Sequence, residues 1–166
     1  TMPDENFEIY ANWSINQYTI TLYTKHPTID TEYSVFRTLT QNYNSDVREL
    51  FATNPSYEGC TFSRWYTDEA LRYPVQSIPT TMPDENLSLY SHITLNEYTL
   101  TIIHKASGEN GQILSEDNEP IYFNATIVLS EAQYSGFTFG GWFTNETFTE
   151  ELNFQTMPSR NLTVYA

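Results

Sequence analysis

The chain has 166 residues and a formal net charge of -14, from 21 acidic and 7 basic side chains. This acidity disfavours nucleic acids and anionic lipid surfaces as partners, and no apolar run approaches the roughly 18 residues of a membrane span. We therefore expect no nucleic-acid binding and no direct membrane insertion. An aromatic content of 16% argues against disorder, because aromatic side chains are normally buried.

The sequence repeats itself in tandem. The phrase TMPDEN begins at residues 1 and 81, and a related TMPSRN begins at residue 156. Residues 1–25 and 81–105 are identical at 12 of 25 positions without a gap. A second block, YEGCTFSRWYTDEAL at 57–71, recurs as YSGFTFGGWFTNETF at 134–148. Because both blocks recur in the same order, the chain is a tandem duplication.

The repeated phrases predict where the units begin and end. If a unit opens at a strand such as QYTITLY, the TMPDEN phrase and the residues after it close the unit before. We therefore expect residues 1–13 to be the C-terminal end of a preceding repeat and residues 14–93 to form repeat one. Residues 94–166 form repeat two, which lacks its last residues. Units this small bury limited surface, so neighbouring copies are expected to stabilise one another.

Alternating segments predict the strands that open and close each repeat. FEIYANW (7–13) alternates apolar and polar side chains and is predicted to close a unit, as are its counterparts beginning at Leu87 and Leu162. YTITLYT (18–24) alternates apolar and tyrosine side chains with threonines, and YTLTIIH (98–104) repeats the pattern. These two segments are predicted to be the first strands of their repeats.

The middle of each repeat is less regular. NSDVRELFA (44–52) favours a short helix capped by Ser45 or Asp46, whereas its counterpart NATIVLSEA (124–132) fits a helix or a strand. Residues 106–120 are polar and predict a hairpin loop or an exposed turn. The predicted fold class is therefore α+β but rich in β-structure, with a mixed sheet and one short helix or helical turn in each module.

CTFSRWYT and FTFGGWFT predict a third strand in each repeat. Phe62 and Trp65 are three residues apart, so they would face opposite sides of a regular strand. A bulge near Ser63–Arg64, or near Gly140–Gly141 in the second copy, would return both rings to the core. We expect structural anchors, rather than sugar-stacking platforms, at Phe62, Trp65, Phe139 and Trp142.

Side chains capable of catalysis form no motif in this sequence. The histidines His26, His92 and His104 lack an accompanying nucleophile motif, so structural roles are expected. Cys60, the single cysteine, is expected to be a small core hydrophobe, with an intermolecular bridge or a reactive thiol as the alternative. Acidic pairs such as Glu150–Glu151 are expected to be solvated surface, without the spacing of a calcium loop. We expect no enzyme activity, no cofactor and no metal site.

The block GFTFGGWFTNETF, followed by NFQTMPSRNLTVYA, resembles the Listeria–Bacteroides repeat, also called the internalin B-repeat. The junctions YANWSINQYTITLY and YSHITLNEYTLTII also fit the passage from one repeat of that family to the next. The chain departs from the family pattern at Ser63–Arg64, where glycine is usual at the second position, and at His92 and Ile93, which replace a basic residue and Trp. The resemblance covers essentially the whole chain. It implies β-grasp-like modules in large secreted or surface-anchored proteins, without catalytic residues.

These observations favour two functions, both extracellular or at the cell surface. The first is a semi-rigid spacer or stalk whose partners are adjacent repeats of the same chain. The alternative is an adhesin module that binds a surface protein or glycan through outward tyrosines such as Tyr10, Tyr23 and Tyr90, since tyrosine gives contact area at low entropic cost. Tyrosine on an outward strand face also serves simply as a good strand former.

Overall fold

The computed structural model describes residues 8–106, 111–131 and 133–166. Contacts within the chain divide it into two compact units. Unit 1 comprises the residues up to Lys25 together with Thr31–Pro55 and Arg64–His92, and unit 2 comprises His26–Asp30, Ser56–Ser63 and Ile93–Ala166. Unit 2 therefore includes two segments of repeat one. The division of the sequence at residues 93 and 94 remains a prediction about the repeats.

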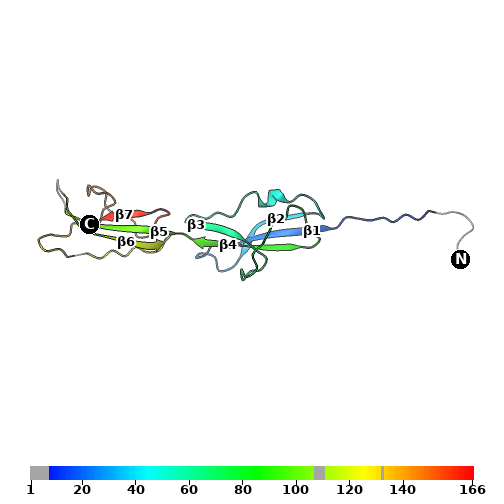
Figure 1. Ribbon diagram of the computed structural model, residues 1–166, viewed down its shortest axis with the longest axis horizontal. Coiled ribbons are helices and arrows are strands. Elements are labelled where there is room, and N and C mark those ends of the chain that lie inside the picture. The colour runs from blue at the N-terminus through cyan, green and yellow to red at the C-terminus, as the bar shows by residue number, and fades with distance from the viewer. Residues whose placement is uncertain (1–7, 107–110, 132) are drawn as a thin grey trace, which may run out of the picture. The chain divides into compact units, whose positions relative to one another are not determined.

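The first sheet has four strands in the order β2-β1-β4-β3 (Figure 1). In chain order they are β1 (Gln17–Thr24), β2 (Ser34–Asn42), β3 (Cys60–Tyr66) and β4 (Leu87–Leu95). β1 pairs antiparallel with β2 and parallel with β4, so the sheet is mixed. Ile20 and Leu22 of β1 are fully buried, which follows from the alternation that predicted this strand.

A 3-10 turn, η1 (Arg48–Phe51), lies between β2 and β3. The carboxylate of Asp46 accepts a hydrogen bond from the backbone N–H of Arg48 at 2.9 Å, and Val47 and Leu50 are buried. Repeat one therefore has a helical turn within the predicted segment, although its N-cap residue is Val47 and not the predicted Ser45 or Asp46. The described residues 124–131 of repeat two form no helix, and the run Ile127–Val128 there is β-branched and poorly suited to one.

The second sheet has three strands in the order β6-β5-β7, and Figure 1 shows β5 between the other two. They are β5 (Glu97–Lys105), β6 (Ile113–Tyr122) and β7 (Leu162–Tyr165). β5 pairs antiparallel with β6 and parallel with β7, which repeats the arrangement around β1. The core of this unit is a cluster of buried apolar side chains: Leu100, Ile102, Ile127, Met157, Leu162 and Val164.

The prediction of a loop over residues 106–120 is wrong for most of that segment. β6 occupies its second half and pairs with β5 along its whole length, while residues 107–110 lie outside the described part. β6 is an edge strand whose side chains are mostly exposed, so it has no alternating apolar pattern to reveal it.

The predicted closing strand at residues 7–13 is also wrong for its described part, residues 8–13. These residues form no strand and are exposed. Their counterparts β4 and β7 are strands because each lies parallel to the first strand of its own repeat. No described strand lies beside residues 8–13, so their backbone groups have no ladder partner.

The third strand is present in repeat one only, so the prediction for repeat two is wrong. β3 pairs with β4, and two consecutive exposed residues, Ser63 and Arg64, interrupt its alternation between half-buried Phe62 and buried Trp65. In repeat two the same block has isolated bridges only at Phe143, to Glu151 and to Tyr165. Within the described residues, no strand lies beside the part of this block that precedes Phe143.

Candidate functional site

Two of the three tyrosines singled out from the sequence lie against one another. Tyr23 of β1 is opposite Tyr90 of β4, and their rings stack with centroids 5.0 Å apart and planes at 12°. Tyr33 meets Tyr90 edge to face at 5.1 Å, and the Lys25 ammonium lies 5.9 Å from the centroid of Tyr33. We call Tyr23, Tyr33 and Tyr90 the tyrosine cluster. Stacking and cation–π contact of this kind stabilise the sheet whether or not anything binds.

Two phenols of this cluster, those of Tyr33 and Tyr90, have a raised pKa. Burial raises the pKa of Tyr33 and of Tyr90, and the carboxylate of Glu69 raises both further. The hydroxyl of Tyr33 donates a hydrogen bond to the backbone oxygen of Ser91 at 3.2 Å, so it is already used within the unit. The cluster thus offers apolar ring surface more than free hydroxyl groups.

Tyr10, the third candidate, is separate from the cluster. It is 83% exposed, and its hydroxyl donates to the carboxylate of Glu8, two residues earlier. No ring contact joins it to Tyr23 or Tyr90 in the described chain. The structure therefore brings two of the three predicted binding residues together and leaves Tyr10 on the exposed segment before β1.

The four aromatic residues expected to be anchors pack against other rings or lie half-buried. Trp65 is 3% exposed and lies 6.4 Å from Phe36, whereas Phe62 is half-buried. In repeat two, Phe139 meets Trp142 edge to face at 5.5 Å. Trp142 is only half-buried, although it stands at the position of Trp65.

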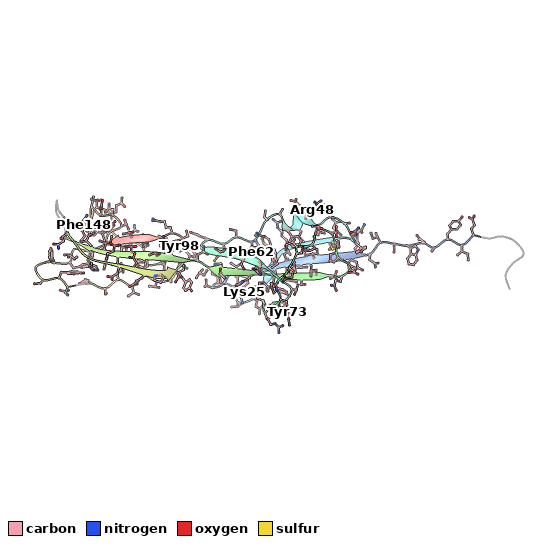
Figure 2. All side chains as sticks on the ribbon, viewed as in Figure 1. Lys25, Arg48, Phe62, Tyr73, Tyr98 and Phe148 are labelled. Carbon is pink, nitrogen blue, oxygen red and sulfur yellow. The ribbon has the colours of Figure 1, made fainter. Side chains whose placement is uncertain are left out.

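Unit 2 contains a pocket of about 370 Å³ over its third-strand block. Five aromatic side chains contribute to its lining: Tyr134, Phe137, Phe139, Phe143 and Phe148. Phe148, labelled in Figure 2, meets Phe143 edge to face at 5.5 Å. The polar lining includes His104 and Lys105, and the ammonium of Lys105 is 3.5 Å from the carboxylate of Glu146. The pocket therefore has a mixed lining of aromatic rings, polar side chains and glycines.

Gly59 and Gly136 occupy matching positions in the two repeats but have opposite surroundings, a difference that the sequence did not predict. Gly59 has φ +64 and is buried, and a Cβ there would lie 2.0 Å from the ring carbon Cγ of Phe123. Gly136 has φ +86 and lines the pocket, with no atom within 4 Å of its would-be Cβ. The available signal was the motif Tyr-x-Gly-x-Thr, present in both blocks. It marks a left-handed turn that is covered in one copy and open in the other.

Cys60 and His26 form a close pair in unit 2. The sulfur of Cys60 is 3.6 Å from Nε2 of His26, while Nδ1 of His26 accepts from the backbone N–H groups of Thr28 and Ile29, each at 3.2 Å. Nδ1 as acceptor places the imidazole proton on Nε2, so the ring donates toward the sulfur and does not remove its proton. Burial also raises the pKa of the Cys60 thiol, the opposite of what an activated nucleophile requires.

The described ranges contain neither a metal-binding cluster nor a membrane-spanning helix. No three His, Cys, Asp or Glu side chains there converge as a metal ion would require. Among these same residues, no helix combines the length and apolar character needed to cross a membrane.

Comparison with known proteins relates both repeats to one family. The model of the Listeria-Bacteroides repeat domain matches residues 18–92 and again residues 101–166. Two similar relatives come from Evansella cellulosilytica: a putative membrane protein, 28% identical over 98% of this chain, and a putative Gly-rich membrane protein, 26% identical over 99%. The chain spans only 22% and 18% of the lengths of these relatives.

Proposed function

Because the chain belongs to the Listeria-Bacteroides repeat domain family, we propose that it is a non-catalytic, semi-rigid spacer within a larger extracellular or cell-surface protein. The modules are β-grasp-like in this proposal, and the parallel pairing of the first and last strands in both mixed sheets supports it. Each repeat thus contributes length, and its partners are the adjacent repeats of the same chain.

The observation that carries the proposal is the connection between the repeats. β4 ends at Leu95 and β5 begins at Glu97, so Asn96 is the one residue between these strands. Its backbone N–H donates to the oxygen of Gly59 at 2.8 Å, and its oxygen accepts from the N–H of Phe123 at 2.9 Å. A connecting residue whose backbone is bonded on both sides is unsuited to serve as a flexible linker.

Charge and the relatives agree with this role. A net charge of -14 favours solubility and disfavours self-association of an exposed array. Both relatives carry the words "membrane protein" in their names, and each is several times longer than this chain. A repeated module that occupies a fraction of such a protein is suited to separating its other parts.

A distance distribution between spin labels tests the semi-rigid character. The labels are placed on Glu49→Cys and Glu119→Cys, both at exposed positions, in a Cys60→Ser background. A spacer predicts one narrow distance distribution. A broad distribution, like that of the same protein with Asn96 replaced by a long Gly/Ser segment as control, would show a flexible tether and overturn the proposal.

The adhesin alternative is favoured by Tyr10, a large side chain that is 83% exposed. Its test is binding of the chain to intact cells and to a panel of glycans and matrix proteins at physiological salt. A spacer predicts no saturable binding. Saturable binding that is lost with Tyr10→Ser but retained with Tyr73→Ser, a matched change at another exposed tyrosine, would make the chain an adhesin module.

A further inference from the structure

The strands that open and close repeat one run parallel to each other. Residues 20–23 of β1 pair in register with residues 87–90 of β4, and we call this pairing the seam. The chain enters β1 at its N-terminal end and leaves β4 at its C-terminal end. A pull transmitted along the chain therefore draws the two strands in opposite directions along their common axis. The hydrogen bonds of the seam are then loaded together, whereas strands separated from one end lose their bonds one after another.

We propose that the seam is a shear clamp, which keeps the repeat folded when the chain is under tension. This role rests on the proposed function, because a spacer carries the pull between the parts that it separates. The clamp gives the repeat a direction of strength. Its resistance to a pull along the chain exceeds its resistance to a pull that separates neighbouring strands from one end.

One face of the seam is buried. Ile20 and Leu22 of β1 and Leu89 of β4 are each no more than 1% exposed. Next to them, the buried hydroxyl of Ser91 donates to Oγ1 of Thr24 at 3.2 Å, which joins β4 to β1 through side chains as well. Hydrogen bonds are stronger in such a low-dielectric environment, so the strands must slide before water can replace these bonds.

Side chains also bridge the two ends of the seam. At one end, Oδ1 of Asn86 accepts from the backbone N–H of Thr19 at 2.8 Å. At the other end, the rings of Tyr23 and Tyr90 stack with centroids 5.0 Å apart. A slide of one residue is about 3.3 Å, enough to break the Asn86 bond and to reduce the overlap of the rings. The ring stack of the tyrosine cluster therefore opposes the movement that tension imposes.

Repeat two has the same parallel pairing but no ring stack across it. β5 pairs parallel with β7, and Oδ1 of Asn161 accepts from the N–H of Thr99 at 2.9 Å, as at the start of the seam in repeat one. Ile103 occupies the position of Tyr23 and lies opposite Tyr165. The duplication therefore supplies a natural replacement for Tyr23 that keeps an apolar, strand-favouring side chain.

Single-molecule force spectroscopy in two pulling geometries tests the clamp. In a Cys60→Ser background, handles on Asn16→Cys and Glu97→Cys flank repeat one, so tension shears the seam. Handles on Asn16→Cys and Tyr43→Cys hold neighbouring residues at the open end of the antiparallel β1–β2 pair, so tension separates those strands bond by bond. We expect an unfolding force at least about twofold higher in the first geometry, whose bonds are loaded together. Forces that are equal, or higher in the second geometry, would overturn the clamp while leaving the spin-label test of the spacer unaffected.

Tyr23→Ile tests the ring stack in both geometries. We expect this change to lower the unfolding force in the shearing geometry by a larger fraction than in the separating geometry. Tyr73→Ile is the matched control, because Tyr73 is 60% exposed and lies outside both strands of the seam, and it should leave both forces unchanged. If Tyr23→Ile lowers both forces by the same fraction, the stack stabilises the fold without opposing shear, and its part in the clamp is overturned.

Discussion

The third-strand block is a paired strand in repeat one, whereas in repeat two it forms no strand and has isolated bridges only at Phe143. β3 lies beside β4, which continues to Leu95, whereas residues 137–142 pass beyond the end of β7 at Tyr165. The two blocks share Thr-Phe-x-x-Trp and the glycine before it. The difference teaches that this motif makes a strand only where a neighbouring strand is present, since strand propensity depends on context.

Burial follows the same difference. Trp65 is 3% exposed and Gly59 is buried, but their counterparts Trp142 and Gly136 are half-buried and exposed. The segment around Gly136 and Trp142 in repeat two is thus more exposed than the matching segment around Gly59 and Trp65 in repeat one. Three pairs of matched substitutions and one pH experiment sharpen or break this comparison.

The largest expected effect is in the cores, where the repeats should be alike. Ile20→Ala and Leu100→Ala each remove a fully buried side chain at corresponding positions, so each should lower the free energy of unfolding by about 2–5 kcal/mol. Urea denaturation followed by tryptophan fluorescence measures this in a Trp13→Phe background, with Trp65 reporting on unit 1 and Trp142 on unit 2. A loss below about 1 kcal/mol for either variant would show that its core is not as packed as described.

Gly59 and Gly136, which occupy matching turns, should respond differently to substitution by alanine. Gly136→Ala keeps open space around its Cβ, so it should cost only the left-handed backbone penalty of about 1–2 kcal/mol. Gly59→Ala meets the Phe123 ring as well and should cost about 1–3 kcal/mol more. Thermal unfolding of both variants checks this. Equal losses would mean that Phe123 does not cover Gly59.

A smaller loss of stability, similar in both repeats, is expected from removing the asparagine side chain that bonds the closing turn to the first strand. The side-chain oxygen of Asn86 accepts from the N–H of Thr19 at 2.8 Å, and that of Asn161 accepts from the N–H of Thr99 at 2.9 Å. Asn86→Ala and Asn161→Ala should each cost about 1 kcal/mol and accelerate exchange of the Thr19 or Thr99 amide. Exchange that is unchanged in one variant would break the equivalence of the two units at this position.

The smallest expected effect is a difference between the repeats in how their stability depends on pH. Hydrogen bonds from Arg48 lower the pKa of the Asp46 carboxyl from 3.8 to about 2, and repeat two has Thr126 at this position. A depressed pKa contributes stability above pH 3.8 that is lost as the pH falls through about 2. Unfolding of unit 1 should show this acid sensitivity, and Asp46→Asn should remove it. The same pH dependence in Asp46→Asn would assign it to other carboxyl groups.

The sequence predicted the strands whose sequence pattern recurs in both repeats. β1, β5, β4 and β3 follow from alternation and duplication, because each of these segments carries apolar side chains toward a core. β2 and β6 were missed because an exposed edge strand has no such pattern. The strand predictions for residues 8–13 and 137–142 were wrong, because each segment would form a strand only beside a neighbouring strand. Sequence periodicity does not encode that neighbour.

The candidate site was predictable only in part, because its contacts also depend on neighbours that the sequence pattern does not encode. Tyr23 and Tyr90 were singled out for exposure, yet the register of β1 and β4 stacks them on each other. The Gly59–Phe123 contact joins residues far apart in sequence, so only the repeated glycine hinted at it. Which glycine is covered depends on the tertiary structure.

Amide hydrogen exchange over the two third-strand blocks tests the central comparison most directly. It is measured by NMR. We expect protected amides within residues 60–66, paired to β4, and fast exchange within residues 137–142. Equal protection of both blocks would contradict the account, because the second block would then be a strand without the neighbour on which its pairing is argued to depend.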